Sequence, residues 1–237
     1  MLFSAHHASS RSFCLTIRLL VMTILAISLT ACGGRFERNS LSGGLLDNKP
    51  RNEQEWRNVA STWGKRYEAN PANQTAALNY SRALRALDQK AQAVAILQQA
   101  AIRAPKDMTV LAAYGKALID VGRAKEATEV LASAHTPDQP DWRVLSAQGT
   151  AADQLGDSST ARHYYNAALK LAPGEPMILS NLGLSYALDK RLPDAERVLR
   201  EAAASPRADQ RVRQNLAFVL ALNGKAGEAD KLLAYSN

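Results

Sequence analysis

The hydrophobic and polar positions of residues 176–207 predict two consecutive helices. The first helix has an apolar stripe with the spacing i, i+3 and i+7, formed by Leu179, Leu182 and Tyr186. The second helix begins near Pro193, because proline is tolerated in a first turn, and its inner face carries Ala195, Leu199 and Ala202. Gly183 lies beside the first stripe, so the sequence predicts a helical hairpin with close contact at this glycine.

The same pattern recurs every 34 residues, which indicates an internal repeat. The small residue beside the stripe is Ser81, Gly115, Gly149, Gly183 and Ala217 in successive copies. The first alanine of the second helix recurs as Ala93, Ala127, Ala161, Ala195 and Ala229, and the large residue after it as Leu97, Leu131, Tyr165, Leu199 and Leu233. Glycines at multiples of the same period, Gly122, Gly156 and Gly224, are predicted to end the first helices in a left-handed conformation.

This periodicity resembles that of the tetratricopeptide repeat (TPR) family across roughly residues 74–237. The resemblance implies an all-α fold, a right-handed α-solenoid of helix-turn-helix repeats. Five repeats are expected, at residues 74–107, 108–141, 142–175, 176–209 and 210–237. The large aromatic residue usual near the start of the first helix in this family is absent, and its positions hold Ala77, Leu111, Leu145, Leu179 and Arg213.

Residues 52–73 are expected to cap the first repeat with one more helix. Its apolar stripe consists of Trp56, Val59, Ala60, Trp63 and Tyr67. Asn52 followed three residues later by Glu55 matches a capping box. The stripe leaves open whether one of the two tryptophans stays exposed for a partner.

Residues 1–31 have the pattern of an export signal, with an apolar run that is short for a membrane-spanning helix. The run ends in Leu-Thr-Ala-Cys-Gly, which resembles a bacterial lipobox and implies acylation of Cys32. An ordinary secretory signal, or a short anchor with a chance cysteine, is the alternative, and the true start codon is open. By resemblance, Gly33 after the cysteine implies sorting to the outer membrane. Residues 32–51 would then be the acylated N-terminus and a flexible tether in the periplasm.

The charge and the cysteine content of the sequence argue against several kinds of partner and site in the repeats. The formal net charge is +7, and the portion from Cys32 onward has 27 basic and 22 acidic side chains, a net charge of +5. Because no basic cluster is apparent, we expect no nucleic-acid partner. Both cysteines, Cys14 and Cys32, precede the repeats, so the repeats contain neither a disulfide nor a thiolate metal site.

In TPR proteins the first helices line a concave groove, and the resemblance assigns groove positions here. The partner-binding residues carried over in this way are Asn79, Arg82, Lys116, Arg143, Asn181, Leu184, Asn215 and Phe218. Asparagine amides suit an extended peptide backbone. The groove would be basic in its N-terminal half and apolar in its C-terminal half, which predicts a ligand with an acidic end and an apolar end. The alternatives are that asparagine is simply common in these helices and that the charges are solvated.

Catalysis has little support in the sequence. His135 and His163 lack metal-ligand spacing, and the chain has no phosphate-binding glycine loop and no nucleophile elbow. We therefore expect a protein that is not an enzyme and that uses no cofactor, metal or small-molecule substrate.

The segment from Ser180 to Asp230, which includes RADQRVRQNL at 207–216, resembles the corresponding part of the TadD family. Members of that family are the TPR lipoproteins of Tad (Flp) pilus assembly systems. The resemblance implies an assembly factor that binds a secretin or other pilus components. A TPR lipoprotein of another envelope machine, such as a type IV pilotin or a regulator of peptidoglycan hydrolases, is the first alternative, and an enzyme is a remote one.

Overall fold

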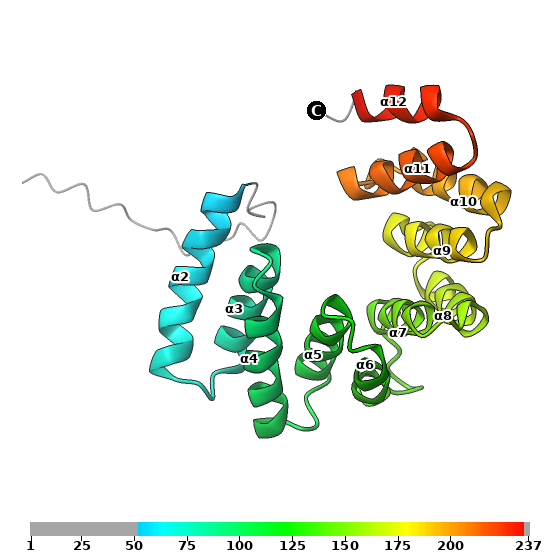
Figure 1. The fold of residues 1–237 in the computed structure, drawn as a ribbon. Helices are drawn as coiled ribbons and strands as arrows, with labels where there is room; N and C mark the ends of the chain where they lie inside the picture. Colours follow the sequence, from blue (N-terminus) through cyan, green and yellow to red (C-terminus); the bar gives the residue numbers. More distant parts are fainter. Residues whose placement is uncertain (1–51, 235–237) are drawn as a thin grey trace, which may run out of the picture. The chain divides into compact units, whose positions relative to one another are not determined.

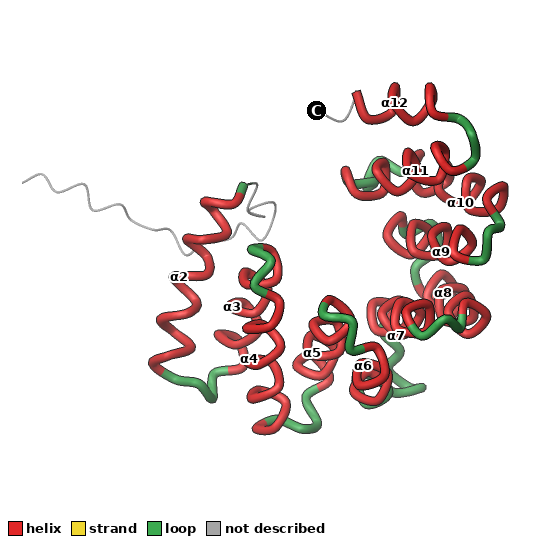
Figure 2. Tube along the Cα trace, viewed as in Figure 1, coloured by secondary structure: helices red, strands yellow, loops and turns green. Residues whose placement is uncertain are grey.

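The structure is a computed structural model that describes residues 52–234, and these residues fold into α-helices (Figure 1). The helices are α2 (Glu53–Ala69), α3 (Gln74–Ala86), α4 (Lys90–Arg103), α5 (Met108–Asp120), α6 (Ala124–Leu131), α7 (Trp142–Gln154), α8 (Ser158–Leu171), α9 (Pro176–Leu188), α10 (Leu192–Ala204), α11 (Gln210–Leu222) and α12 (Ala226–Ala234). Short loops and turns join them (Figure 2). The predicted export signal, acylated Cys32 and tether lie outside the described residues.

Helices α3 to α12 form five hairpins, each made of a first helix and a second helix. The first helices begin at Gln74, Met108, Trp142, Pro176 and Gln210, which are 34 residues apart. The period found in the sequence is therefore the period of the helix pairs, and the all-α prediction is confirmed.

The first helices form the inner layer of this array. Every helix packs against the next one along the chain, and α3, α5, α7, α9 and α11 also pack against one another in that order. Within residues 52–234, successive second helices do not pack backbone against backbone, although Arg200 of α10 forms an ion pair with Glu228 of α12. Neighbouring pairs pack mainly through the second helix of one pair and the first helix of the next, and the contacts between successive first helices make the inner layer a continuous surface.

Helix starts follow local capping chemistry. Side-chain oxygens accept hydrogen bonds from first-turn amides at Asn52, Asn73, Asp107, Asp141, Asp157 and Asp209. Pro193 lies in the first turn of α10, as predicted. These caps fix the first residues of six helices through short-range hydrogen bonds.

The turn inside each hairpin uses one left-handed residue. The φ angle is 76° at Gly122, 82° at Gly156 and 76° at Gly224, as predicted. Asp88, with φ of 59°, and Lys190, with φ of 60°, occupy the equivalent position in the other two turns. Sequence analysis missed both, because only glycine was taken as the signal for a left-handed residue, although aspartate also adopts this conformation more often than most residues.

The small residues of the first helices admit the large residues of the second helices. A Cβ atom placed on Gly115 would lie 2.5 Å from Leu131, and one on Gly183 would lie 2.6 Å from Leu199. Leu131 and Leu199 are fully buried. The predicted contact between small and large residues is therefore the centre of these hairpins.

The second hairpin departs from the pattern. Helix α6 has eight residues, whereas α4 and α8 have 14. The chain then turns through a loop in which Thr136 and Gln139 form an isolated β-bridge. Ala134 lies beyond the end of α6 but is still buried in the core, so the loop continues the packing that the helix would have supplied.

Helix α2 packs against α3, in the place that a second helix would take before the first repeat. Trp56 and Trp63 are both half-buried, and guanidinium groups stack near their rings, Arg82 at Trp56 and Arg66 at Trp63. Among residues 52–234, no helix has the length and apolar character needed to cross a membrane.

Candidate partner-binding groove

The first cavity of the inner layer is basic. It has a volume of about 510 Å³ and lies over α3, α5 and the start of α7. Four predicted groove residues line it: Asn79, Arg82, Lys116 and Arg143. Met108 and Gln139 contribute to its wall, so both the inner helices and the loop after α6 shape it.

A second cavity of about 350 Å³ continues toward α9. Lys116 and Arg143 line this cavity too, and Asn181 joins them from α9. Trp142 and Arg211 complete its mixed aromatic and basic wall. Sequence analysis missed Arg211, although it lies two repeat periods after the predicted groove residue Arg143.

A third cavity, of about 280 Å³, lies between α7 and α9 and is mostly apolar. Leu184 and Leu188 line it, together with Thr150 and Asn181, which also line the second cavity. The first and second cavities share Arg85, Lys116 and Arg143. The three cavities therefore form one continuous groove from α3 to α9, here called the inner groove.

Most cations of the inner groove have no carboxylate partner. Arg85 pairs with Asp120 at 2.5 Å between Nε and Oδ2. In the described part of the chain, Arg82, Lys116, Arg143 and Arg211 form no ion pair. This part of the groove carries an excess of positive charge.

Lys116 is half-buried and lies near three other charged side chains. Burial lowers the pKa of its ammonium group, the carboxylate of Asp141 opposes this effect, and the charges of Arg85 and Arg143 add to it. Asp141 is itself occupied as the N-cap of α7, where its Oδ1 accepts a hydrogen bond of 2.7 Å from the backbone amide of Arg143. Lys116 thus lies between two arginines and one carboxylate, and that carboxylate also caps α7.

The predicted asparagines also have a structural role. Asn181 donates to Ser146 Oγ at 3.1 Å and Asn215 donates to Ser180 Oγ at 2.9 Å, each bond joining neighbouring first helices. Asn79 donates to a backbone carbonyl of its own helix at 2.8 Å. Asn181 and Asn215 therefore help to hold neighbouring first helices together, whereas the Asn79 bond stays within α3.

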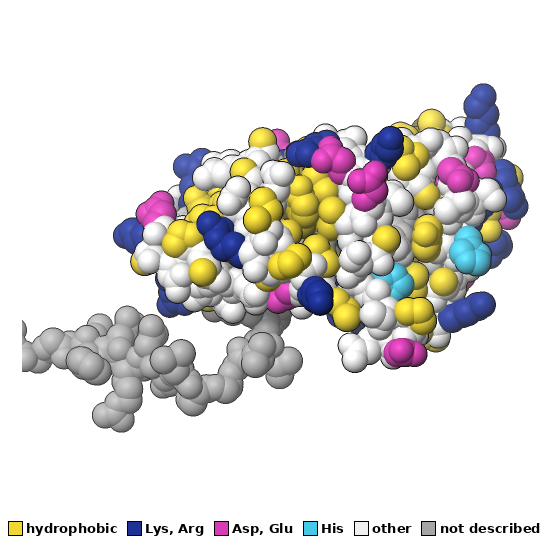
Figure 3. Space-filling view, turned by 90° about the horizontal axis from the view of Figure 1, so that it is seen from below, with side chains coloured by type: hydrophobic (Ala, Val, Ile, Leu, Met, Phe, Trp, Pro, Cys, Tyr) yellow, Lys and Arg dark blue, Asp and Glu magenta, His cyan; other side chains and the backbone are white. Residues whose placement is uncertain are grey.

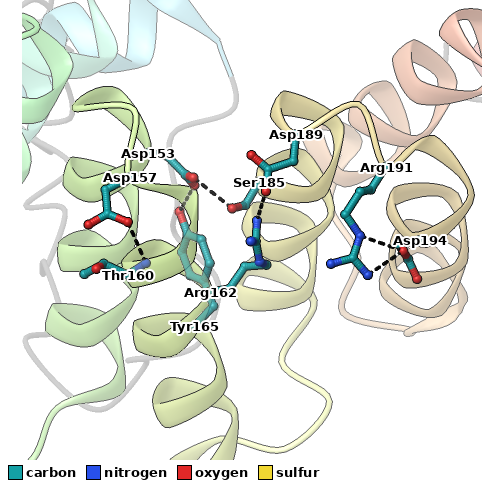
Figure 4. A network of polar contacts seen from close by, with 9 residues as sticks. All are labelled: Asp153, Asp157, Thr160, Arg162, Tyr165, Ser185, Asp189, Arg191 and Asp194. Carbon is teal, nitrogen blue, oxygen red and sulfur yellow. Dashed lines mark hydrogen bonds and ion pairs between the residues drawn. The ribbon is translucent and has the colours of Figure 1, made fainter.

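Asp153 lines the third cavity and was missed by sequence analysis. Its carboxylate accepts hydrogen bonds from the Tyr165 hydroxyl at 2.9 Å and from the Ser185 hydroxyl at 2.8 Å (Figure 4). Burial raises the pKa of Asp153, while these hydrogen bonds and the charge of Arg162 oppose the effect. Arg162 itself pairs with Asp189. One half-buried carboxylate thus joins α7, α8 and α9.

The C-terminal half of the inner layer exposes large apolar side chains. Leu188 on α9 is 63% exposed, and Phe218 and Leu222 on α11 are 57% and 51% exposed. Phe218 and Asn215 lie outside the three cavities described above. Large apolar side chains are therefore exposed on α9 and α11, while Arg211 of α11 still lines the basic second cavity.

Few other side chains among the described residues have the chemistry of a catalytic or metal-binding group. His163 is exposed and packs edge-on against Tyr164, and the Nδ1 atom of half-buried His135 has no hydrogen-bond partner there. No group of three metal-ligating side chains occurs among residues 52–234. On the face that Figure 3 shows, Lys and Arg are scattered among other side chains and form no single basic patch.

Helix pairs with a shared inner groove define an α-solenoid of the type that binds other proteins. A family model described as tetratricopeptide repeat matches residues 146–209, which identifies the repeat type. No curated protein is significantly similar to the chain in sequence.

Solved structures resemble this one in fold. The crystal structure of PilW, a widely conserved type IV pilus biogenesis factor, is 19% identical with a TM-score of 0.63, over 77% of this chain and 84% of PilW. The thermophilic TPR protein TTC0263 of Thermus thermophilus is 19% identical with a TM-score of 0.63, over 71% of this chain and 92% of that chain. The human IFIT1 dimer with m7Gppp-AAAA is 16% identical with a TM-score of 0.65, and the match covers 78% of this chain and 47% of IFIT1. The fold is a TPR solenoid, which is typical of non-enzymatic scaffolds for protein interaction.

Proposed function

We propose that this protein is a non-enzymatic adaptor for assembly of a Tad (Flp) pilus. It is held at the periplasmic face of the outer membrane by acyl chains on Cys32, and its inner groove binds a segment of a secretin or of another pilus component. The observation that carries the adaptor role is the continuous groove of the inner layer, with cations that lack carboxylate partners.

The pilus assignment rests on the sequence. The segment from Ser180 to Asp230 resembles the TadD family, and the lipobox ending in Cys32 matches a lipoprotein. The likeness to PilW supports the repeat fold only, because the two chains are 19% identical. The resemblance to the TadD family favours a Tad system over a type IV pilotin or a regulator of peptidoglycan hydrolases, whereas the lipobox is common to all three.

The test is chemical crosslinking in cells followed by affinity purification from membranes and mass spectrometry. The intact protein is expected to recover a secretin or pilus subunit, and Cys32→Ser to recover less because it is no longer held at the membrane. The double variant Arg82→Glu, Lys116→Glu should also recover less. Lys125→Glu, at an exposed position of α6, is its matched control and should recover as much as the intact protein.

Recovery of cell-wall enzymes in place of pilus components would mean that the groove serves another envelope machine. Full recovery by the Arg82→Glu, Lys116→Glu variant would contradict binding in the basic part of the inner groove.

A further inference from the structure

The inner groove changes its chemistry along its length, and this change restricts what it binds. The first and second cavities share Lys116 and Arg143, and the second and third share Thr150 and Asn181. One extended chain can therefore follow all three cavities. Its side chains meet cations over α3 and α5 and apolar carbon over α9.

The basic part favours an anion. Lys116 is half-buried beside Arg85 and Arg143, and only Arg85 has a carboxylate at salt-bridge distance in the described residues. Removing a cation from water among like charges is unfavourable, and a bound carboxylate relieves both effects. Arg82 and Arg211 extend the same potential to either side of Lys116.

The apolar part rejects an anion. Leu184 and Leu188 supply its wall, so a large aliphatic or aromatic side chain buries apolar surface there. Asp153 also lines it, with its two oxygens already accepting hydroxyl donors. A second carboxylate in this cavity would meet a negative charge that is poorly solvated, so the cavity discriminates by repulsion as well as by shape.

The distance between the basic part and the apolar part of the inner groove determines how far apart the two ends of a ligand must be. Helices α5 and α9 are separated by α7, and packed helices lie roughly 10 Å apart, so the span is roughly 20 Å. An extended chain advances about 3.3 Å per residue, which gives about six residues between the two anchors.

Building on the adaptor function proposed above, we infer that the groove selects an extended protein segment with an acidic run and a large apolar side chain about six residues apart. The acidic run lies against Lys116 and its neighbouring arginines, and the apolar side chain enters the cavity formed by Leu184 and Leu188. A continuous polyanion such as a nucleic acid does not fit, because the apolar cavity and Asp153 interrupt the basic surface.

The test is fluorescence anisotropy with labelled synthetic peptides and the full-length lipoprotein in detergent. The probes carry Glu-Asp-Glu at one end and Leu-Phe at the other, joined by Ser-Gly spacers of about two, six or ten residues. Probes with only the acidic or only the apolar end, together with empty micelles, are controls. The spacer of about six residues should bind at least about tenfold more tightly than the single-ended probes, and added salt should weaken this binding.

Exchanging the charges of Lys116 and of the probe tests where the acidic end of the probe binds. Lys116→Glu should weaken the best probe about tenfold, and a probe with Lys-Lys-Lys in place of Glu-Asp-Glu should recover binding to that variant. Leu184→Ser should reduce affinity for the probe with Leu-Phe but not for the purely acidic probe. Lys125→Glu should bind the best probe as the unchanged protein does. Circular dichroism of each variant establishes that it is folded.

Equal affinity for every spacer, binding of the purely acidic probe as tight as the best probe, or no binding of any probe would overturn the inference. If any of these occurs while membrane crosslinking still recovers a pilus component, the adaptor function stands without this ligand. If the best probe binds as expected but no pilus component is recovered, the groove is correctly described and the pilus assignment is wrong.

Discussion

Gly149 of α7 lies so close to Tyr165 of α8 that a Cβ atom on the glycine would stand 2.6 Å from Cε1 of the ring. Tyr165 is 1% exposed and its hydroxyl bonds to Asp153, so the ring is fixed on both sides. This contact explains why the third repeat has glycine at a position where a helix would otherwise favour alanine.

Gly149→Ala is expected to lower the free energy of unfolding by about 1–3 kcal/mol, because the added methyl group overpacks the contact with Tyr165. Urea denaturation followed by circular dichroism measures this change. Gly227→Ala on α12 is the control, since nothing lies within 4 Å of a Cβ atom there. It should stabilise the protein by up to about 1 kcal/mol through helix propensity. A Gly149→Ala variant as stable as the unchanged protein would show that the two helices can separate without cost.

Lys190→Gly is expected to raise the free energy of unfolding by about 1 kcal/mol, because Lys190 has a left-handed backbone, with φ of 60°, that glycine adopts without strain. The gain is limited by the greater freedom of glycine in the unfolded chain. Thermal denaturation measures the shift. Gly156→Lys, at the equivalent turn, should lower stability by a similar amount. Shifts of the same sign in both variants would contradict the assignment of strain.

The repeat pattern was predictable because it depends on short-range features. Spacing of apolar residues, a small residue opposite a large one and turn glycines fixed the hairpins, and Gly183 does meet Leu199 as expected. The basic cavity was also anticipated in part, since Arg82, Lys116 and Arg143 line it together.

The contacts between repeats were not predictable in the same way. Asn181 meets Ser146 and Ser185 meets Asp153 across pairs of first helices, and the relative rotation of neighbouring repeats decides such meetings. One sequence period does not specify that rotation.

Glu196 of α10 ties the fourth hairpin to the fifth. The Lys225 ammonium lies 2.7 Å and 2.9 Å from its two carboxylate oxygens, and Asn223 donates to it at 2.6 Å. The hydrogen bond from Lys225, together with those from Asn223 and Arg200, outweighs burial and lowers the pKa of Glu196 from 4.5 to about 2. The ionised form is therefore favoured in the folded protein.

Glu196→Gln is expected to lower the free energy of unfolding by about 1–3 kcal/mol at pH 7, because it removes hydrogen bonds to a charged group. A folded-state pKa below the unfolded one contributes stability above pH 4.5 that is lost as the pH falls toward about 2. The difference between the two proteins should therefore shrink over that range in urea titrations at several pH values. Glu201→Gln, exposed on the same helix, should change stability by less than about 0.5 kcal/mol. A pH-independent difference would mean that packing, not charge, explains the loss.

Asp153 should behave in the opposite sense, because burial raises its pKa. An acid whose pKa is higher in the folded state disfavours folding once it ionises, so its contribution declines as the pH rises above the ordinary value of 3.8. Asp153→Asn keeps an oxygen acceptor without the charge and should be at least as stable as the unchanged protein at pH 7. Asp153→Ala leaves the hydroxyls of Tyr165 and Ser185 without their acceptor and should cost about 1–3 kcal/mol. Urea denaturation of both variants at pH 7 separates the effects: equal losses for Asn and Ala would show that the negative charge itself stabilises the junction of α7, α8 and α9.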